Sequence, residues 1–310
     1  MMPNIVWVSL ESTRYDNTSL SDYRRDTTPF LAEFASRPRA TAFHQCITHG
    51  KWTGTSTASM LTGTHAPTHG IYGSGSVGGN LVLSDEIQTI PEMLPDDYTS
   101  LNLTSNPNVG PLKGFDRGFD EVEEVYPSKL RETVAPQTLV KSVPQLWAHG
   151  GGLTSDIDRH KGLSSYMMVD SAKRFASAGN APRFMYLHFN SSHHPYLPPA
   201  SHRDKFIDEI SASAKEALAT AQTKYEDIHK LIADGGLTEE ELERVTAMYD
   251  AVLSHVDLCV GHLVEYLLRD DEEWIVVITG DHGDLLGEYG LAGHKFALHD
   301  GLVHVPLVTY

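Results

Sequence analysis

Short apolar runs alternate with helix-like segments along the 310 residues of the chain. The runs that are typical of buried strands are NIVWVSLE (4–11), RFMYLHFNSSHH (183–194) and EEWIVVITGDHGD (272–284). Helical patterns lie between them near residues 89–95 and 166–179, and over residues 238–271, where Thr238 and three glutamates open a stretch with apolar residues at three- and four-residue spacing. That stretch predicts one long helix or two. Strands alternating with helices predict an α/β fold, with a mostly parallel central sheet and helices on both faces.

A segment rich in hydroxyl side chains, WTGTSTASMLTG, occupies residues 52–63. It predicts a short helix that ends at Gly63 and has Thr53, Thr55 or Ser56 as its N-cap. A purely structural cap is one interpretation of Thr53. The other is that its hydroxyl lies at the positive end of the helix and also coordinates a metal, which together would favour the alkoxide and make it a nucleophile.

Polar residues follow each of the three predicted strands: Glu11 after the first, SSHH after the second, and Asp281 with His282 after the third. In parallel sheets, ligands bind outside the carboxyl ends of the strands. A carboxylate at one strand end can simply cap a turn, but three polar strand ends together favour a ligand site. Carboxylates and imidazoles suit Zn²⁺, Mn²⁺ or Mg²⁺, so Glu11, Asp281 and His282 form a candidate metal site.

Composition restricts the possible partners. The chain has 41 acidic and 24 basic residues and a formal net charge of −17, which disfavours nucleic acid and anionic membranes. No run of about 18 apolar residues and no secretory-type start are present, so we expect no membrane insertion and a cytoplasmic location. The cysteines, Cys46 and Cys259, lie far apart and outside any CxxC pair, which predicts neither a disulfide framework nor a thiolate zinc site.

Six segments in a fixed order carry a resemblance to a known family. They are PNIVWVSLESTRYDNTSL, WTGTSTASMLTGTHAPTHGIYG, TIPEMLPDDYTSLNLTSNPNV with GFDRGFDEV, MYLHFNSSHHPYLPP, MYDAVLSHVDLCVGHLVEYL, and VVITGDHGDLLGEYGLAGHKFALHDGLVHVPLV. Over essentially its full length, the chain resembles the sulfatase branch of the alkaline phosphatase superfamily. The resemblance implies that superfamily's α/β fold.

The chain departs from sulfatases at the nucleophile. Thr53 stands where sulfatases have a Cys or Ser that is oxidised to formylglycine, and the Pro and Arg of that motif are missing. Glu11 replaces the usual Asp, and Ser12 stands where a second Asp can occur. The combination of Glu11, Thr53, Asp281 and His282 is similar to the Glu, Thr, Asp and His set of the superfamily's single-metal phosphotransferases, such as lipoteichoic-acid synthases and phosphoethanolamine transferases. The resemblance implies one divalent ion (Mn, Zn, Mg or Ca) held by Glu11, Thr53, Asp281 and His282.

The resemblance also implies roles for side chains around the ester. Lys295 matches the family's oxyanion-binding lysine, and with His193 it would hold the remaining oxygens or protonate the leaving group. His294 is a weaker candidate for either role, and Arg14 is a candidate for orienting the nucleophile. No set of ligands for a second metal can be assigned from the sequence, and three nearby residues have no assigned role: His299, Asp300 and His304.

These features predict a metal-dependent hydrolase or transferase of small anionic sulfuric or phosphoric esters, with Thr53 as nucleophile. Threonine favours phosphoryl chemistry. A formylglycine hydrate can expel sulfate by collapsing to the aldehyde, whereas a threonine sulfate has no such elimination and would need direct attack by water. The alternative is a catalytically weak or inactive family member that acts in binding. We expect a single domain over residues 1–310, truncated or reduced, because the family's C-terminal subdomain would follow Tyr310.

Overall fold

A seven-stranded sheet forms the centre of the computed structural model, which describes residues 2–72, 82–148, 161–179, 181–270 and 272–310. Its strand order is β2-β9-β6-β1-β5-β3-β4. The strands from β6 to β4 run parallel, whereas β9 is antiparallel to both β6 and β2. These strands are β1 (Asn4–Leu10), β2 (Thr41–Ile47), β3 (Thr99–Thr104), β4 (Glu121–Glu124), β5 (Arg183–Phe189), β6 (Trp274–Gly280) and β9 (His304–Thr309). A separate hairpin consists of β7 (Leu285–Leu286) and β8 (Ala292–Gly293).

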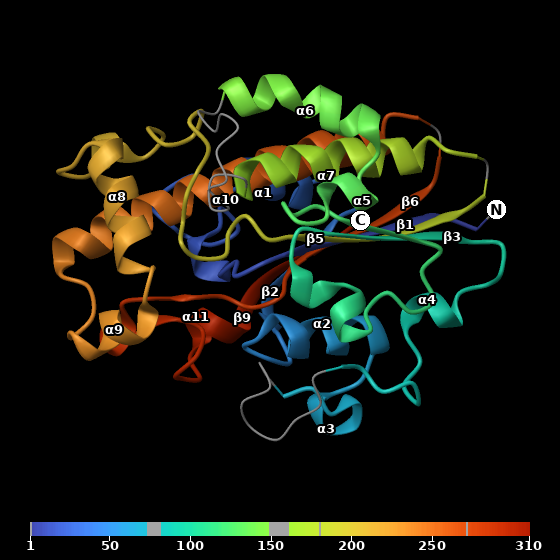
Figure 1. The fold of residues 1–310 in the computed structure, drawn as a ribbon, viewed down its shortest axis with the longest axis horizontal. Helices are drawn as coiled ribbons and strands as arrows, with labels where there is room; N and C mark the ends of the chain where they lie inside the picture. Colours follow the sequence, from blue (N-terminus) through green and yellow to red (C-terminus); the bar gives the residue numbers. More distant parts are fainter. Residues whose placement is uncertain (1, 73–81, 149–160, 180, 271) are drawn as a thin grey trace.

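Helices cover both faces of the sheet (Figure 1). One face carries α1 (Pro29–Ala35), α6 (Pro136–Ala148), α7 (Lys161–Ala176) and α10 (Glu239–Leu267). The opposite face carries α2 (Thr53–Thr62), α3 (Ala66–His69) and α4 (Ile90–Met93). The remaining helices are α5 (Leu130–Thr133), α8 (Ala214–Lys224), α9 (Ile228–Ala233) and α11 (Asp300–Val303), with 3₁₀ turns η1 (Tyr15–Asn17), η2 (Pro107–Val109), η3 (Pro111–Lys113), η5 (Ile207–Glu209) and η6 (Glu288–Gly290).

The apolar residues form two clusters, one on each face of the sheet. Strand β5 contributes to both, because successive side chains of a strand point to opposite faces. Met185, Leu187 and Phe189 pack in the larger cluster with α7 and α10, whereas Phe184 and Tyr186 pack in the smaller one with α2. The next side chain on the α2 face after Tyr186 is His188, which is fully buried. A polar side chain therefore follows the apolar ones at the strand's carboxyl end.

The register of the central strands brings their carboxyl ends together. Leu10 of β1 pairs with Phe189 of β5 on one side and with Gly280 of β6 on the other. The pairing continues one residue further, because the Glu11 N–H donates to the Phe189 carbonyl (3.0 Å) and the Asp281 N–H donates to the Leu10 carbonyl (3.2 Å). Glu11 and Asp281 therefore leave the sheet at the same level.

The structure confirms the predicted α/β class, the mostly parallel sheet and its covering on both faces. The stretch after Thr238 is a single helix, α10, and Thr238 opens it with a capping box in which its hydroxyl accepts from the Glu241 N–H. Gly63 ends α2 in a left-handed conformation with φ 64°, as predicted. Both cysteines are free.

The predicted N-cap of α2 is wrong. The helix begins at Thr53, with Trp52 in the N-cap position, so none of Thr53, Thr55 and Ser56 is the cap. The reason is that the Thr53 hydroxyl donates to the Glu11 carboxylate rather than accepting from its own helix. In the described part of the chain, no helix is both long and apolar enough to cross a membrane.

Candidate active site

Thr53 occupies the first turn of α2, where the helix meets the carboxyl ends of β1 and β6. Its hydroxyl donates a hydrogen bond of 2.6 Å to Glu11 Oε1 and lies 3.2 Å from His282 Nε2. All three side chains are buried. Helix α2 directs the positive end of its dipole at this point, which stabilises negative charge on the threonine oxygen. The structure thus brings the predicted nucleophile against two of its predicted metal ligands.

Two further side chains fix the second oxygen of the Glu11 carboxylate. Glu11 Oε2 lies 2.6 Å from His188 Nε2 and accepts a 2.7 Å hydrogen bond from the Asn106 side-chain amide. Burial by itself raises the pKa of Glu11, but the hydrogen bonds from His188 and His282 outweigh burial and hold the pKa well below its usual range. Glu11 is therefore an oriented carboxylate that stays ionised.

Asp281 has one oxygen in use and one that faces the site. Its Oδ1 accepts from the backbone N–H groups of Ser12 (3.0 Å) and His282 (2.7 Å). Ser12 reaches it from a left-handed conformation with φ 50°, which is costly for a residue with a side chain and is typical of functional sites. Asp281 Oδ2 is buried and has no hydrogen-bond partner among the described residues. Burial and the neighbouring Glu11 charge raise the pKa of Asp281 to about 6.

The hydrogen bonding of His282 leaves its Nε2 facing the same space. Its Nδ1 lies 2.8 Å from the Gly283 carbonyl oxygen, which assigns a proton to Nδ1 and leaves Nε2 to carry a second proton or to bind a cation. That Nε2 lies 3.5 Å from Asp281 Oδ2 and 3.4 Å from Glu11 Oε1. Burial lowers the pKa of His282, but the Asp281 and Glu11 carboxylates outweigh it and raise the pKa to about 10. The cluster therefore requires a positive charge, either as a second proton on His282 or as a cation.

These side chains fit a divalent cation. One ligand atom from each of Glu11, Asp281 and His282 lies within 4.8 Å of the others. Two carboxylates, an imidazole and the Thr53 hydroxyl are donors that suit the divalent ions expected from the sequence. The unpartnered Asp281 Oδ2 is the atom that this assignment explains best, because a buried carboxylate oxygen without a partner is otherwise costly.

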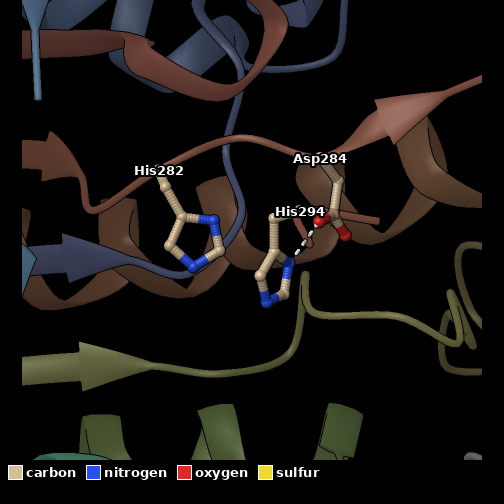
Figure 2. A group of neighbouring side chains, drawn as sticks. All are labelled: His282, Asp284 and His294. Carbon is tan, nitrogen blue, oxygen red and sulfur yellow. Dashed lines mark hydrogen bonds and ion pairs between the residues drawn. The ribbon is translucent and has the colours of Figure 1, made fainter. Parts of the chain in front are cut away.

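A second group shares His282 and adds Asp284 and His294 (Figure 2). Here the atoms already bond to one another: His294 Nδ1 lies 2.6 Å from Asp284 Oδ1, and the Tyr196 hydroxyl donates to Asp284 Oδ2 at 2.8 Å. The His282 and His294 rings lie 4.4 Å apart, centre to centre. The Asp284 carboxylate therefore orients the His294 ring, which lies beside the ligand cluster.

Arg14 lies near the site but does not contact Thr53. Its guanidinium pairs with Asp16 (2.6 Å) and Glu288 (2.5 Å), and its Nη1 donates to the Asp284 backbone carbonyl (3.1 Å). Arg14 thus holds the segment that follows the Asp281 and His282 ligands.

His193 and Lys295 take different positions at the rim. The half-buried His193 has its ring 5.4 Å from that of His294, and its Nδ1 lies 2.6 Å from the His194 carbonyl. Lys295 is exposed, and its backbone carbonyl accepts from the Lys51 ammonium at 2.9 Å. The unassigned residues act locally: His299 accepts from the Gly301 N–H, Asp300 lies in the first turn of α11, and His304 bonds the His44 carbonyl.

Sequence reasoning missed the residues that hold the ligands in place. His188 lies within the predicted strand 183–194, and its polarity in an otherwise apolar run was the available signal. Asn106 follows β3 at the same edge of the sheet, but only the tertiary structure shows that it faces Glu11. Asp284 lies two residues after His282, where the spacing alone did not link it to His294.

Comparison with known proteins identifies the family of the chain. The sequence profile of the Sulfatase family matches residues 3–310. The chain belongs to the sulfatase family. Its relatives include the uncharacterized sulfatase YidJ of Escherichia coli K12, which is 26% identical over 200 residues, or 62% of this chain and 34% of YidJ. The choline-sulfatase of Rhizobium meliloti is 36% identical over 74 residues, or 23% of this chain and 14% of that protein.

Solved structures share the fold of this sulfatase-family chain. The phosphonate monoester hydrolase of Agrobacterium radiobacter superposes with a TM-score of 0.75 at 18% identity, covering 99% of this chain and 68% of that one. The periplasmic domain of E. coli EptC in complex with Zn superposes with a TM-score of 0.66 at 16% identity, covering 99% and 72%. The chain thus spans about a third of the length of YidJ and about two thirds of that hydrolase.

Proposed function

We propose that this sulfatase-family protein hydrolyses or transfers phosphoric or sulfuric esters, with Thr53 as the nucleophile. One observation carries the proposal: the Thr53 hydroxyl, at the start of α2, bonds the ionised Glu11 and faces His282 and the unpartnered Asp281 Oδ2. A structural threonine needs only one partner, whereas this one shares a buried space with three potential ligands of a cation. The proposed substrate is a small anionic ester.

Glu11, Thr53, Asp281 and His282 would hold one divalent ion. When bound, the ion would act as a Lewis acid, lowering the pKa of the threonine hydroxyl and offsetting charge that develops on the ester oxygens. The fit rests on the donor set and on Asp281 Oδ2. The Thr53 side chain favours phosphoryl over sulfuryl transfer, because a threonine ester cannot release its group by collapsing to an aldehyde as a formylglycine hydrate does.

The chain's own residues would act in two stages. Thr53 Oγ1 would attack phosphorus after its proton has passed to water, while the ionised Glu11 orients the hydroxyl through their hydrogen bond. The bond to the alcohol oxygen breaks, and that oxygen takes a proton from His193 at the rim or from the buried His294 beside the ligand cluster. Water or an acceptor hydroxyl would then attack the same phosphorus and give its proton to the imidazole that protonated the leaving group; the bond between phosphorus and Thr53 Oγ1 breaks, and Thr53 Oγ1 takes a proton from water.

Two charged side chains near Thr53 would help to bind the substrate and to position the neighbouring backbone. Lys295, exposed at the rim, would hold an ester oxygen once substrate is present. Arg14 would act as a positioning residue through its bond to the Asp284 carbonyl, rather than by touching Thr53.

The single domain over residues 1–310 and the cytoplasmic location stay predictions from the sequence. Limited proteolysis and cell fractionation test them.

A substrate panel tests the function. Protein loaded with Mn²⁺ or Zn²⁺ should turn over p-nitrophenyl phosphate, its phenyl diester or p-nitrophenyl sulfate, and the phosphorus esters should be preferred. Thr53→Ala should abolish turnover and, because Glu11 loses one donor, should lower the melting temperature by only a few degrees without unfolding the protein. Thr57→Ala, which changes another buried threonine of α2, is the matched control. Absence of both metal binding and turnover across the panel would instead support an inactive, binding member of the family.

A further inference from the structure

An apolar pocket lies beside the candidate active site, next to the carboxyl ends of β3 and β5. Its volume is about 540 Å³, which lies within the usual range for small-molecule sites. The segment η2–η3 forms one wall, and the turn before α5 together with α7 forms the others. The apolar side chains that line it include Pro107, Leu112, Val125, Pro127, Leu130 and Met167.

The pocket and the ligand cluster share a wall. Ser105 and Asn190 line the pocket, and Asn190 N–H donates to Ser105 Oγ at 2.9 Å. The residue after Ser105 is Asn106, which holds Glu11 Oε2, and Ser192, two residues after Asn190, donates to the Glu11 backbone carbonyl. The pocket therefore begins next to the residues that hold Glu11, at the same edge of the sheet as Thr53.

The charge of the lining selects what can enter. Among the described residues that line the pocket, Lys129 is the charged one, and its ammonium pairs with Glu132 at 2.5 Å. The pocket thus offers no free charge to an anionic group. It offers mostly apolar surface, and its polar lining consists of neutral hydroxyl and amide side chains: Ser105, Tyr126, Ser128, Ser164 and Asn190. Leu112, at 68% exposure, is a large apolar side chain that an occupant would cover.

We propose that this pocket binds the neutral, apolar organic group of the ester, an aryl or medium-length alkyl group. The anionic centre of the same molecule lies against Thr53. This assignment rests on the proposed function and narrows its substrate class, because an ester of a small or charged alcohol leaves the pocket unfilled.

Binding of 1-naphthol, followed by its fluorescence, tests the pocket without any turnover. We expect saturable binding to the full chain that Thr53→Ala leaves unchanged and Leu112→Asp weakens about tenfold, the scale expected for an apolar contact. Val140→Asp is the matched control, because Val140 is also an exposed apolar residue (71%) and lies on α6 outside the pocket. Absence of saturable binding, or equal binding by the Leu112 variant, would overturn the assignment.

Kinetics then separate this assignment from the proposed function. The metal-loaded protein should show a higher kcat/KM for 1-naphthyl phosphate than for methyl phosphate, and Leu112→Asp should reduce that ratio about tenfold, whereas Val140→Asp should leave it unchanged. A ratio that Leu112→Asp leaves intact overturns the pocket assignment. Naphthol binding without turnover of any ester overturns the proposed function and leaves the pocket as a binding site for apolar groups.

Discussion

Replacing His188 tests how the fold orients its predicted metal ligand. His188 Nε2 lies 2.6 Å from Glu11 Oε2, and both side chains are fully buried. His188→Leu removes the donor and keeps an apolar side chain of similar bulk in β5. His188→Gln places an amide donor near the position of Nε2, so it should restore the bond.

The size of the effect follows from the donors to Glu11. Its carboxylate has three short side-chain contacts of 2.6 to 2.7 Å, from Thr53 on Oε1 and from Asn106 and His188 on Oε2, while His282 Nε2 lies farther away at 3.4 Å from Oε1. Loss of one hydrogen bond to a buried charge costs about 2 kcal/mol of unfolding free energy. Loss of a residue that orients a metal ligand weakens metal affinity by about 10- to 100-fold, which corresponds to about 1.4 to 2.7 kcal/mol. The two routes therefore predict a similar magnitude.

Two assays measure these quantities. Urea denaturation of the metal-free proteins should show a loss of about 2 kcal/mol for His188→Leu, most of which His188→Gln recovers. Calorimetric titration with Mn²⁺ or Zn²⁺ should show about 10- to 100-fold weaker binding for the Leu variant. Metal affinity equal to that of the parent, or a Gln variant no better than Leu, would refute the assignment of His188 as the residue that orients Glu11.

Three further substitutions test buried contacts and backbone conformation in the fold. Burial raises the pKa of Asp257 to about 7, although the Phe30 and Leu31 N–H groups at the start of α1 donate to it. The unfolded chain loses this proton near pH 4, so this group makes the free energy of unfolding fall as the pH rises from about 4 to 7. Asp257→Asn should remove about 1.4 kcal/mol per pH unit of that fall, as measured by urea denaturation at several pH values. The same pH dependence in the parent and the variant would contradict this. A Cβ on Gly283 would lie 2.0 Å from the Gly301 carbonyl oxygen, so Gly283→Ala should cost about 3 kcal/mol. Gly63→Ala has open space and should cost about 1 kcal/mol for its positive φ, and thermal melts that rank the two glycine variants the other way would contradict the packing argument.

Local sequence patterns predicted three central strands of the sheet and the position of the ligand cluster. The apolar runs at 4–11, 183–194 and 272–284 contain β1, β5 and β6, because buried parallel strands need continuous apolar side chains. Polar residues directly after those strands predicted the ligand cluster, because the carboxyl ends of neighbouring parallel strands meet at one edge of the sheet. Glu11, Asp281 and His282 accordingly lie together.

Contacts between distant segments could not be predicted in the same way. The N-cap prediction for α2 failed because the Thr53 hydroxyl bonds Glu11, a residue 42 positions away, instead of its own helix. Arg14 appeared suited to orient Thr53, but the carboxylates of Asp16 and Glu288 engage its guanidinium. Such competition between partners depends on tertiary geometry, which no spacing rule contains.

Detection of a covalent adduct on Thr53 tests the central claim most directly. Metal-loaded protein mixed with p-nitrophenyl phosphate and quenched in acid should carry the mass of one phosphoryl group on the peptide that contains Thr53. Thr53→Ala should carry none and should show no turnover. Turnover that persists in Thr53→Ala, or an adduct on a different residue, would contradict the assignment of Thr53 as the nucleophile.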